Sequence, residues 1–142
     1  MGIHPNKRDV ILKNACIFVW KQAAARNKFE VIFLTEARAF LSELDEKTRD
    51  KIIFNTRKAK VKNDKEIFKK LKGEIWELRT LFNQKQYRLF AFWDKTDKAE
   101  ALVLATHGII KKTGKTPLKE IEKAERIRQL YFEQKNEKNG KR

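Results

Sequence analysis

Alternating hydrophobic and polar residues predict four β-strands along the chain. They are KFEVIFL (28–34), IWELRTLF (75–82), QYRLFAFWD (86–94) and AEALVLATHG (99–108). A period of two, with many β-branched and aromatic residues, is typical of strands. Only short polar segments separate the last three strands, so these three predict an antiparallel meander.

A second spacing, with apolar residues three and four positions apart, predicts three helices. One begins near Thr35, a second runs from about Glu46 to Val61, and a third begins at Pro117. Proline favours the first position of a helix, because its missing N–H has no intrahelical partner there.

The order of these elements predicts an α+β fold. We expect a small antiparallel sheet of three to four strands with the helices packed on one face and the other face open to a ligand. The folded domain is expected to span residues 28–132. Residues 1–27 are interpreted as a helical N-terminal extension, and 133–142 as a charged, flexible tail.

Charge indicates the class of partner. The chain carries 34 Lys and Arg against 19 Asp and Glu, a net charge of +15. Such an excess favours a polyanionic partner, with nucleic acid ahead of an anionic membrane and an acidic protein. The apolar runs are too short to span a bilayer, and the single Cys16 excludes an intrachain disulfide. We therefore expect a cytoplasmic location and no membrane partner.

Several catalytic signatures are missing from the sequence. It contains no GxSxG, no Walker loop and no HExxH, and its two histidines exclude a multi-histidine metal site. These features disfavour a triad hydrolase, a nucleotide-binding fold and a metal-dependent nuclease. We predict that the protein uses no cofactor and no metal.

An arginine pair is the most specific chemical feature. If a two-residue turn at 83–84 joins two strands, Arg79 lies opposite Arg88, and cross-strand partners share one face of the sheet. Two facing cations are unfavourable without an anion between them, so the pair predicts an anion site. The alternative is that Arg79 forms surface ion pairs with Glu77 or Glu74.

Other candidates lie at both ends of the meander. Two lysine clusters are present: Lys69, Lys70 and Lys72 before the strands, and Lys111, Lys112 and Lys115 after them. Lysine runs are more often solvated surface than sites. His107 has two interpretations, a hydrogen-bonded strand end and a catalytic group.

Two long segments carry a resemblance to a known family. They read FKKLKGEIWELRTLFNQKQYRLFAFWD and ALVLATHGIIKKTGKTPLKEIEKAERIRQLYF. They contain, in this order, a basic pair before a glycine, an ELR motif, a YR motif and an HG-x-x-KK-x-x-K-x-P motif. The order and spacing of these motifs resemble those of the phage-derived RelE/HigB-like toxins. The resemblance covers roughly residues 28–132. Ile109-Ile110 departs from the family, which usually has an aromatic residue after the glycine.

The resemblance implies a RelE-like fold and the toxin of a type II toxin–antitoxin system. It implies an mRNA interferase that acts on the ribosome, is neutralised by a cognate antitoxin, and meets DNA only through that antitoxin. The assigned residues are Arg79, Arg88, Lys112 and His107 for catalysis, and Lys70, Lys72, Lys111 and Lys115 for RNA binding.

The expected chemistry needs no metal. Attack by a ribose 2′-oxygen on the adjacent phosphate builds negative charge, which fixed Arg and Lys donors stabilise. The general base is open between His107 and a lysine whose pKa neighbouring cations depress. Two alternatives remain, a non-catalytic basic module that binds RNA or DNA, and a catalytically degenerate toxin relative that acts with an antitoxin.

Overall fold

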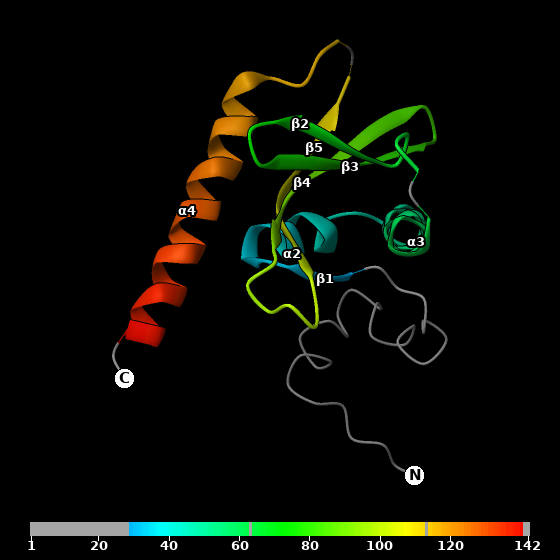
Figure 1. Ribbon diagram of the computed structural model, residues 1–142. Helices are drawn as coiled ribbons and strands as arrows, with labels where there is room; N and C mark the ends of the chain where they lie inside the picture. Colours follow the sequence, from blue (N-terminus) through cyan, green and yellow to red (C-terminus); the bar gives the residue numbers. More distant parts are fainter. Residues whose placement is uncertain (1–28, 63, 113, 141–142) are drawn as a thin grey trace.

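The computed structural model describes residues 29–140 except 63 and 113. The described residues form five strands and three helices (Figure 1). In chain order they are β1 (Glu30–Phe33), α2 (Thr35–Ser42), α3 (Glu46–Val61), β2 (Phe68–Lys72), β3 (Ile75–Phe82), β4 (Lys85–Asp94), β5 (Leu102–Lys111) and α4 (Leu118–Gly140). The extension predicted for 1–27 lies outside the described residues.

The strands form one open mixed sheet in the order β1-β5-β4-β3-β2. The predicted antiparallel meander of β3, β4 and β5 is confirmed. The prediction of three to four antiparallel strands was wrong in two details. The edge strand β1 pairs in parallel with β5, and β2 adds a fifth strand. The lysines of FKKLK hide the strand pattern of β2, and lysine is a common residue on exposed sheet edges.

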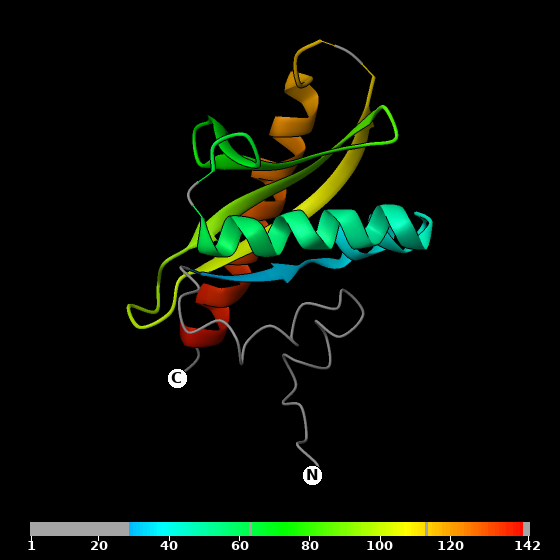
Figure 2. The same cartoon turned by 90° about the vertical axis from the view of Figure 1, so that its right-hand side faces the viewer.

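Helices cover both faces of the sheet, so the prediction of helices on one face was wrong. Helices α2 and α3 pack on one side, while α4 runs along the other (Figures 1 and 2). The run Leu89–Phe92 shows the reason, since Leu89 and Ala91 join the core under α2 and α3, while Phe90 and Phe92 join the core under α4. A strand that is apolar on both sides needs cover on both sides.

Helix α4 leaves one end of its sheet face uncovered. Its buried Ala124 packs with Phe90 and Phe92 in the middle of β4. Toward the β3–β4 turn the residues on this face become charged, and Leu81 there is 65% exposed. The open surface that was expected over a whole face is therefore confined to this end of the sheet.

The C-terminal segment continues as helix. Helix α4 runs on through residues 133–140, and Lys135 within it reaches the sheet to contact Asp94 at 2.6 Å. None of the described helices combines the length and the apolar character needed to cross a bilayer.

Candidate nucleic-acid interface

The predicted pairing of the two arginines is confirmed. Strands β3 and β4 are joined at Asn83 and Gln84, whose φ angles of 53° and 66° lie in the left-handed region. Positive φ at both central residues is typical of the two-residue hairpin turn. The register that follows places Arg79 directly opposite Arg88, so both side chains lie on the face that α4 leaves open at this end.

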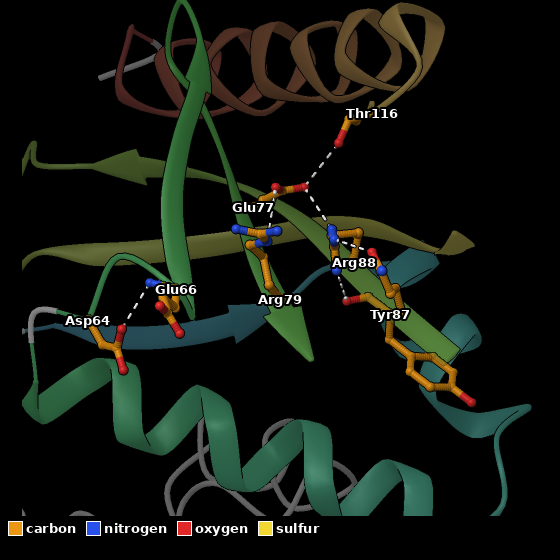
Figure 3. Close-up of polar contacts among 8 residues, drawn as sticks. Asp64, Glu66, Glu77, Arg79, Tyr87, Arg88 and Thr116 are labelled. Atoms are coloured by element: carbon orange, nitrogen blue, oxygen red, sulfur yellow. Dashed lines mark hydrogen bonds and ion pairs between the residues drawn. The ribbon is translucent and has the colours of Figure 1, made fainter. Parts of the chain in front are cut away.

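One carboxylate lies between the two arginines. Glu77 Oε1 is 3.4 Å from Arg88 Nε, and its Oε2 is 3.6 Å from Arg79 Nε (Figure 3). Glu77 and Arg88 are each only 3% exposed. The ion pair of Arg79 with Glu77, considered as an alternative above, is thus present, but Glu77 is shared. We call these three residues the arginine cluster; it holds two cations and one anion.

The arginine cluster is loosely bonded. Within the described part of the chain, the buried Nε atoms of Arg79 and Arg88 have no hydrogen-bond partner, although both lie at ion-pair distance from Glu77. Buried donors are normally hydrogen-bonded, and exceptions require an explanation. A bound anion would supply acceptors for such donors.

Arg88 is held in one orientation. Its Nη2 donates to Gln86 Oε1 at 2.6 Å, and its Nη1 donates to the Tyr87 carbonyl at 3.4 Å. Burial lowers the pKa of Arg88, the nearby Arg79 lowers it further, and Glu77 opposes both effects. A guanidinium remains charged in proteins nonetheless, so Arg88 presents a fixed positive charge.

A hollow of about 380 Å³ lies beside the cluster. We call it the arginine hollow; it is lined by Glu66, Arg79, Thr80, Leu81, Gln86 and Arg88. Its lining therefore includes two arginines, the amide residue Gln86 and the carboxylate residue Glu66. That arrangement can bind a phosphate through charge-assisted, bidentate hydrogen bonds.

Two lysines extend the positive surface across the sheet. Lys111 on β5 pairs with Gln86, and Lys69 on β2 pairs with Glu77, so both belong to the arginine face. Burial lowers the pKa of Lys111, as do Arg88, Arg79 and Lys69, while Glu77 raises it. The structure therefore brings cations from four neighbouring strands together.

The loop before α4 carries the remaining lysines. Lys111, Lys112 and Lys115 line a second hollow of about 400 Å³. Thr116 ties this loop to the arginine cluster, because its hydroxyl donates to Glu77 Oε1 at 3.3 Å. Neither Lys111 nor Lys112 lines the arginine hollow. Lys111 ends β5 opposite Gln86, and Arg88 and Arg79 both lower its pKa, so Lys111 is the lysine of this group that lies beside the arginines.

Two predicted RNA-binding lysines lie elsewhere. Lys70 pairs with Trp76, whose ring packs against the core under α2 and α3, so Lys70 lies on the opposite face from the arginines. Lys72 follows a register shift and pairs with Ile75 at the far end of β3. The pairing of β2 with β3 places Lys69 opposite Glu77, so Lys69 is the lysine of this segment on the arginine face.

His107 is a buried connection between β5 and α4. It is 3% exposed, its Nε2 lies 2.9 Å from Glu120 Oε1, and its Nδ1 lies 2.9 Å from Thr106 Oγ1. Its ring stacks on Phe90 with centroids 4.9 Å apart. Burial lowers the pKa of His107, against the opposing effect of Glu120. The structure does not bring His107 into the arginine hollow.

No group of three or more His, Cys, Asp or Glu residues in the described ranges is arranged to hold a metal ion. The side chains that gather at the candidate site are instead mostly Arg and Lys.

The fold and the cluster define a small α+β protein with a cationic site at one end of its sheet. The family model of the phage-derived protein Gp49-like family (DUF891) matches residues 39–129, and the chain belongs to that family. The family is commonly associated with the toxins of toxin–antitoxin systems. No curated protein matches the chain. The matched segment contains Arg79, Arg88 and Lys111.

Proposed function

We propose that this protein is the toxin of a toxin–antitoxin system and cleaves mRNA on the ribosome, as a metal-independent endoribonuclease of the RelE/HigB type. The observation that carries the proposal is the arginine cluster, in which Arg79 and Arg88 face the same hollow and share a single carboxylate. Family membership and the net charge of +15 support it.

The arginine cluster suits attack by the ribose 2′-oxygen on the adjacent phosphate. Negative charge grows on the phosphoryl oxygens in the transition state, and donors that are already positioned stabilise it without reorganising. Arg88 is fixed by Gln86 and by its own strand, and Arg79 lies half-exposed beside it. The products would carry a 2′,3′-cyclic or 3′-phosphate and a 5′-hydroxyl.

The surrounding lysines also help to bind the RNA backbone in this proposal. Lys69, Lys111 and Lys115 place further positive charge beside the cluster, where the RNA backbone would run. Contacts to several phosphates make binding weaken steeply as salt rises. The ribosome would present the codon, and a cognate antitoxin would neutralise the protein in the cytoplasm.

The decisive experiment is induced expression followed by mapping of mRNA 5′ ends. Growth arrest, relief by the product of the adjacent small gene, and new 5′ ends within translated codons are expected. To test the role of metal, the protein is treated with a chelator, desalted and added to purified ribosomes with bound mRNA. It should still cleave. Efficient cleavage of naked RNA that this stripping abolishes would contradict the mechanism.

One observation favours a second candidate, a binding module without catalysis. Glu77 already offsets one of the two arginine charges, as it would in a purely structural cluster. A protein that binds ribosomes in a salt-dependent way but leaves every mRNA intact would support this candidate.

A further inference from the structure

The proposed reaction requires a group that takes the proton from the 2′-hydroxyl. Two nearby candidates are already engaged. Both oxygens of Glu77 lie at ion-pair distance from the arginines, and Thr116 donates to one of them. His107 is buried against Glu120. A proton acceptor must be sought among the groups that face the hollow.

Glu66 is the only carboxylate among the described residues that line the arginine hollow. It is exposed and lies in the turn that leads into β2. Asp64 fixes this turn, because its Oδ1 accepts from the Glu66 backbone N–H at 2.9 Å (Figure 3). The next residue, Ile67, accepts at its carbonyl from the Arg79 backbone N–H at 2.7 Å. The backbone of the turn that carries Glu66 is therefore held next to the backbone of Arg79.

Lys111 lies on the other side of the arginines. The strand order β5-β4-β3-β2 gives the sequence Lys111, Arg88, Arg79 and then the turn with Glu66. An in-line displacement places the attacking and leaving oxygens on opposite sides of the phosphorus. A phosphate held by both arginines would thus have a carboxylate near one of these oxygens and an ammonium near the other.

We propose that Glu66 is the general base and Lys111 the general acid of the cleavage reaction; this inference rests on the proposed function. The 2′-hydroxyl gives its proton to the Glu66 carboxylate as the bond from the 2′-oxygen to phosphorus forms. The bond from phosphorus to the 5′-oxygen breaks, and the 5′-oxygen takes a proton from the Lys111 ammonium. The products are a 2′,3′-cyclic phosphate and a 5′-hydroxyl.

The protonation states fit these roles. A carboxylate can accept a proton and an ammonium can donate one. The base is therefore assigned to Glu66, on one side of the arginines, and the acid to Lys111, on the other side. General acids work best when their pKa lies near the working pH. The pKa of Lys111 is lowered by burial and by the cations around it, which moves it in that direction.

The test of Glu66 is single-turnover cleavage of mRNA bound to purified ribosomes. Glu66→Gln should lower the rate by about 10²–10⁴-fold, the usual contribution of a positioned acid or base. The concentration that half-saturates the ribosome should stay unchanged. Glu74→Gln is the matched control, because it removes the same charge from an exposed turn residue that does not line the hollow, and it should cleave like wild type.

The test of Lys111 uses an mRNA in which sulfur replaces the bridging 5′-oxygen at the cleavage site. A thiolate leaves without being protonated, so Lys111→Met should be slow on the oxygen substrate and close to wild type on the sulfur substrate. Lys98→Met, in the exposed β4–β5 turn, is the charge control. Glu66→Gln should be slow on both substrates.

The outcomes separate the two proposals. If wild-type protein leaves ribosome-bound mRNA intact, the proposed function fails and this inference fails with it. If wild type cleaves and Glu66→Gln cleaves equally fast, the proposed function stands and the base assignment is overturned. A slow Lys111→Met that sulfur does not rescue overturns the acid assignment.

Discussion

Two buried carboxylates on the same side of the sheet differ in how they are bonded. Asp94, at the end of β4 under α4, accepts from Tyr131 Oη and Lys135 Nζ at 2.6 Å each, and from the Thr96 backbone N–H at 2.9 Å. Glu77 has two cations at 3.4 and 3.6 Å and one hydroxyl at 3.3 Å. Asp94 has short contacts and one cation; Glu77 has long contacts and two.

This difference separates a structural cluster from a candidate site. At Asp94 the charges balance and the acceptor is satisfied, so the group fastens α4 to the sheet. At Glu77 one positive charge is left over and two buried Nε donors have no hydrogen bond within the described residues. A bound anion would supply acceptors and balance the charge at the arginine cluster, whereas the contacts of Asp94 leave no such need.

The titration behaviour follows the same division. Burial alone would raise the pKa of Asp94, but hydrogen bonds from Lys135, Thr96 and Tyr131 outweigh it and hold that pKa well below its usual range. Burial raises the pKa of Tyr131, and so does the adjacent Asp94. At the arginine cluster burial lowers the pKa of Arg88, and the opposing effect of Glu77 does not fully offset it.

Among the tests of this comparison between the two carboxylates, the largest expected effect is on cleavage when the arginines are removed. Arg79→Ala or Arg88→Ala should each lower the cleavage rate by about 10²–10³-fold, the usual cost of one positioned donor. Toxicity should disappear in the double variant while antitoxin binding stays intact. Lys115→Ala should do less, because Lys111 and Lys112 line the same hollow. Growth assays measure the loss of toxicity, and single-turnover rates measure the loss of cleavage in each variant.

The control for this prediction is the folded state. Circular dichroism and thermal unfolding of the double variant should show a cooperative transition. A double variant that folds and still cleaves would contradict the site. A double variant that cannot fold would show that the arginines, like Asp94, have a structural role.

Part of this comparison could be predicted from the sequence. Alternation and the short turn at 83–84 fixed the register, and the register determined that Arg79 faces Arg88. Pairing in a hairpin is a local property, so it can be counted along the chain. The packing of a helix on the second face of the sheet was not predicted, although the unbroken apolar run around Phe90 indicated that both faces are covered.

The rest depends on contacts between distant segments. Lys69 lies on the arginine face, and Glu66 lines the arginine hollow, only because β2 pairs with β3, and the lysines of β2 concealed that strand. The connection of His107 to Glu120 depends on where α4 docks. No spacing along the chain encodes such contacts, so the roles of these residues could not be separated from the sequence.

The second prediction concerns stability without loss of chemistry. Asp94→Asn should lower the free energy of unfolding by about 2 kcal/mol at neutral pH, because Lys135 and Tyr131 lose a charged acceptor. The folded pKa of Asp94 is depressed, so its contribution is present above the unfolded value of about 3.9 and is lost as pH falls toward the folded value. Denaturant titrations should show a constant gap from wild type between about pH 5 and 8 that narrows in stronger acid.

This prediction has a matched readout in activity. The cleavage rate per folded molecule should be unchanged in Asp94→Asn, since Asp94 lies away from the arginine hollow. A stable variant with impaired cleavage would remove the distinction between the two carboxylates.

The third prediction alters the balance of charge at the arginine cluster. Glu77→Gln should cost about 1 kcal/mol of stability, because one charged partner of two arginines becomes neutral. It should also raise the affinity for anions, so added phosphate should increase the melting temperature more than it does for wild type. Asp94→Asn serves as control and should show no such gain. An equal phosphate response in Glu77→Gln and wild type would contradict an anion site between the arginines.

The smallest effect is expected at His107, which we group with Asp94 as a structural residue. Its pKa is lowered in the folded protein, mainly by burial, so the unfolded chain binds the proton more readily. Stability must then fall as pH decreases through the unfolded value of about 6.5 and rise as pH increases. His107→Gln should flatten this slope between about pH 5 and 7 and leave cleavage per folded molecule at pH 8 unchanged. An unaltered slope would mean that other groups cause it, and a folded variant that no longer cleaves would return His107 to the site.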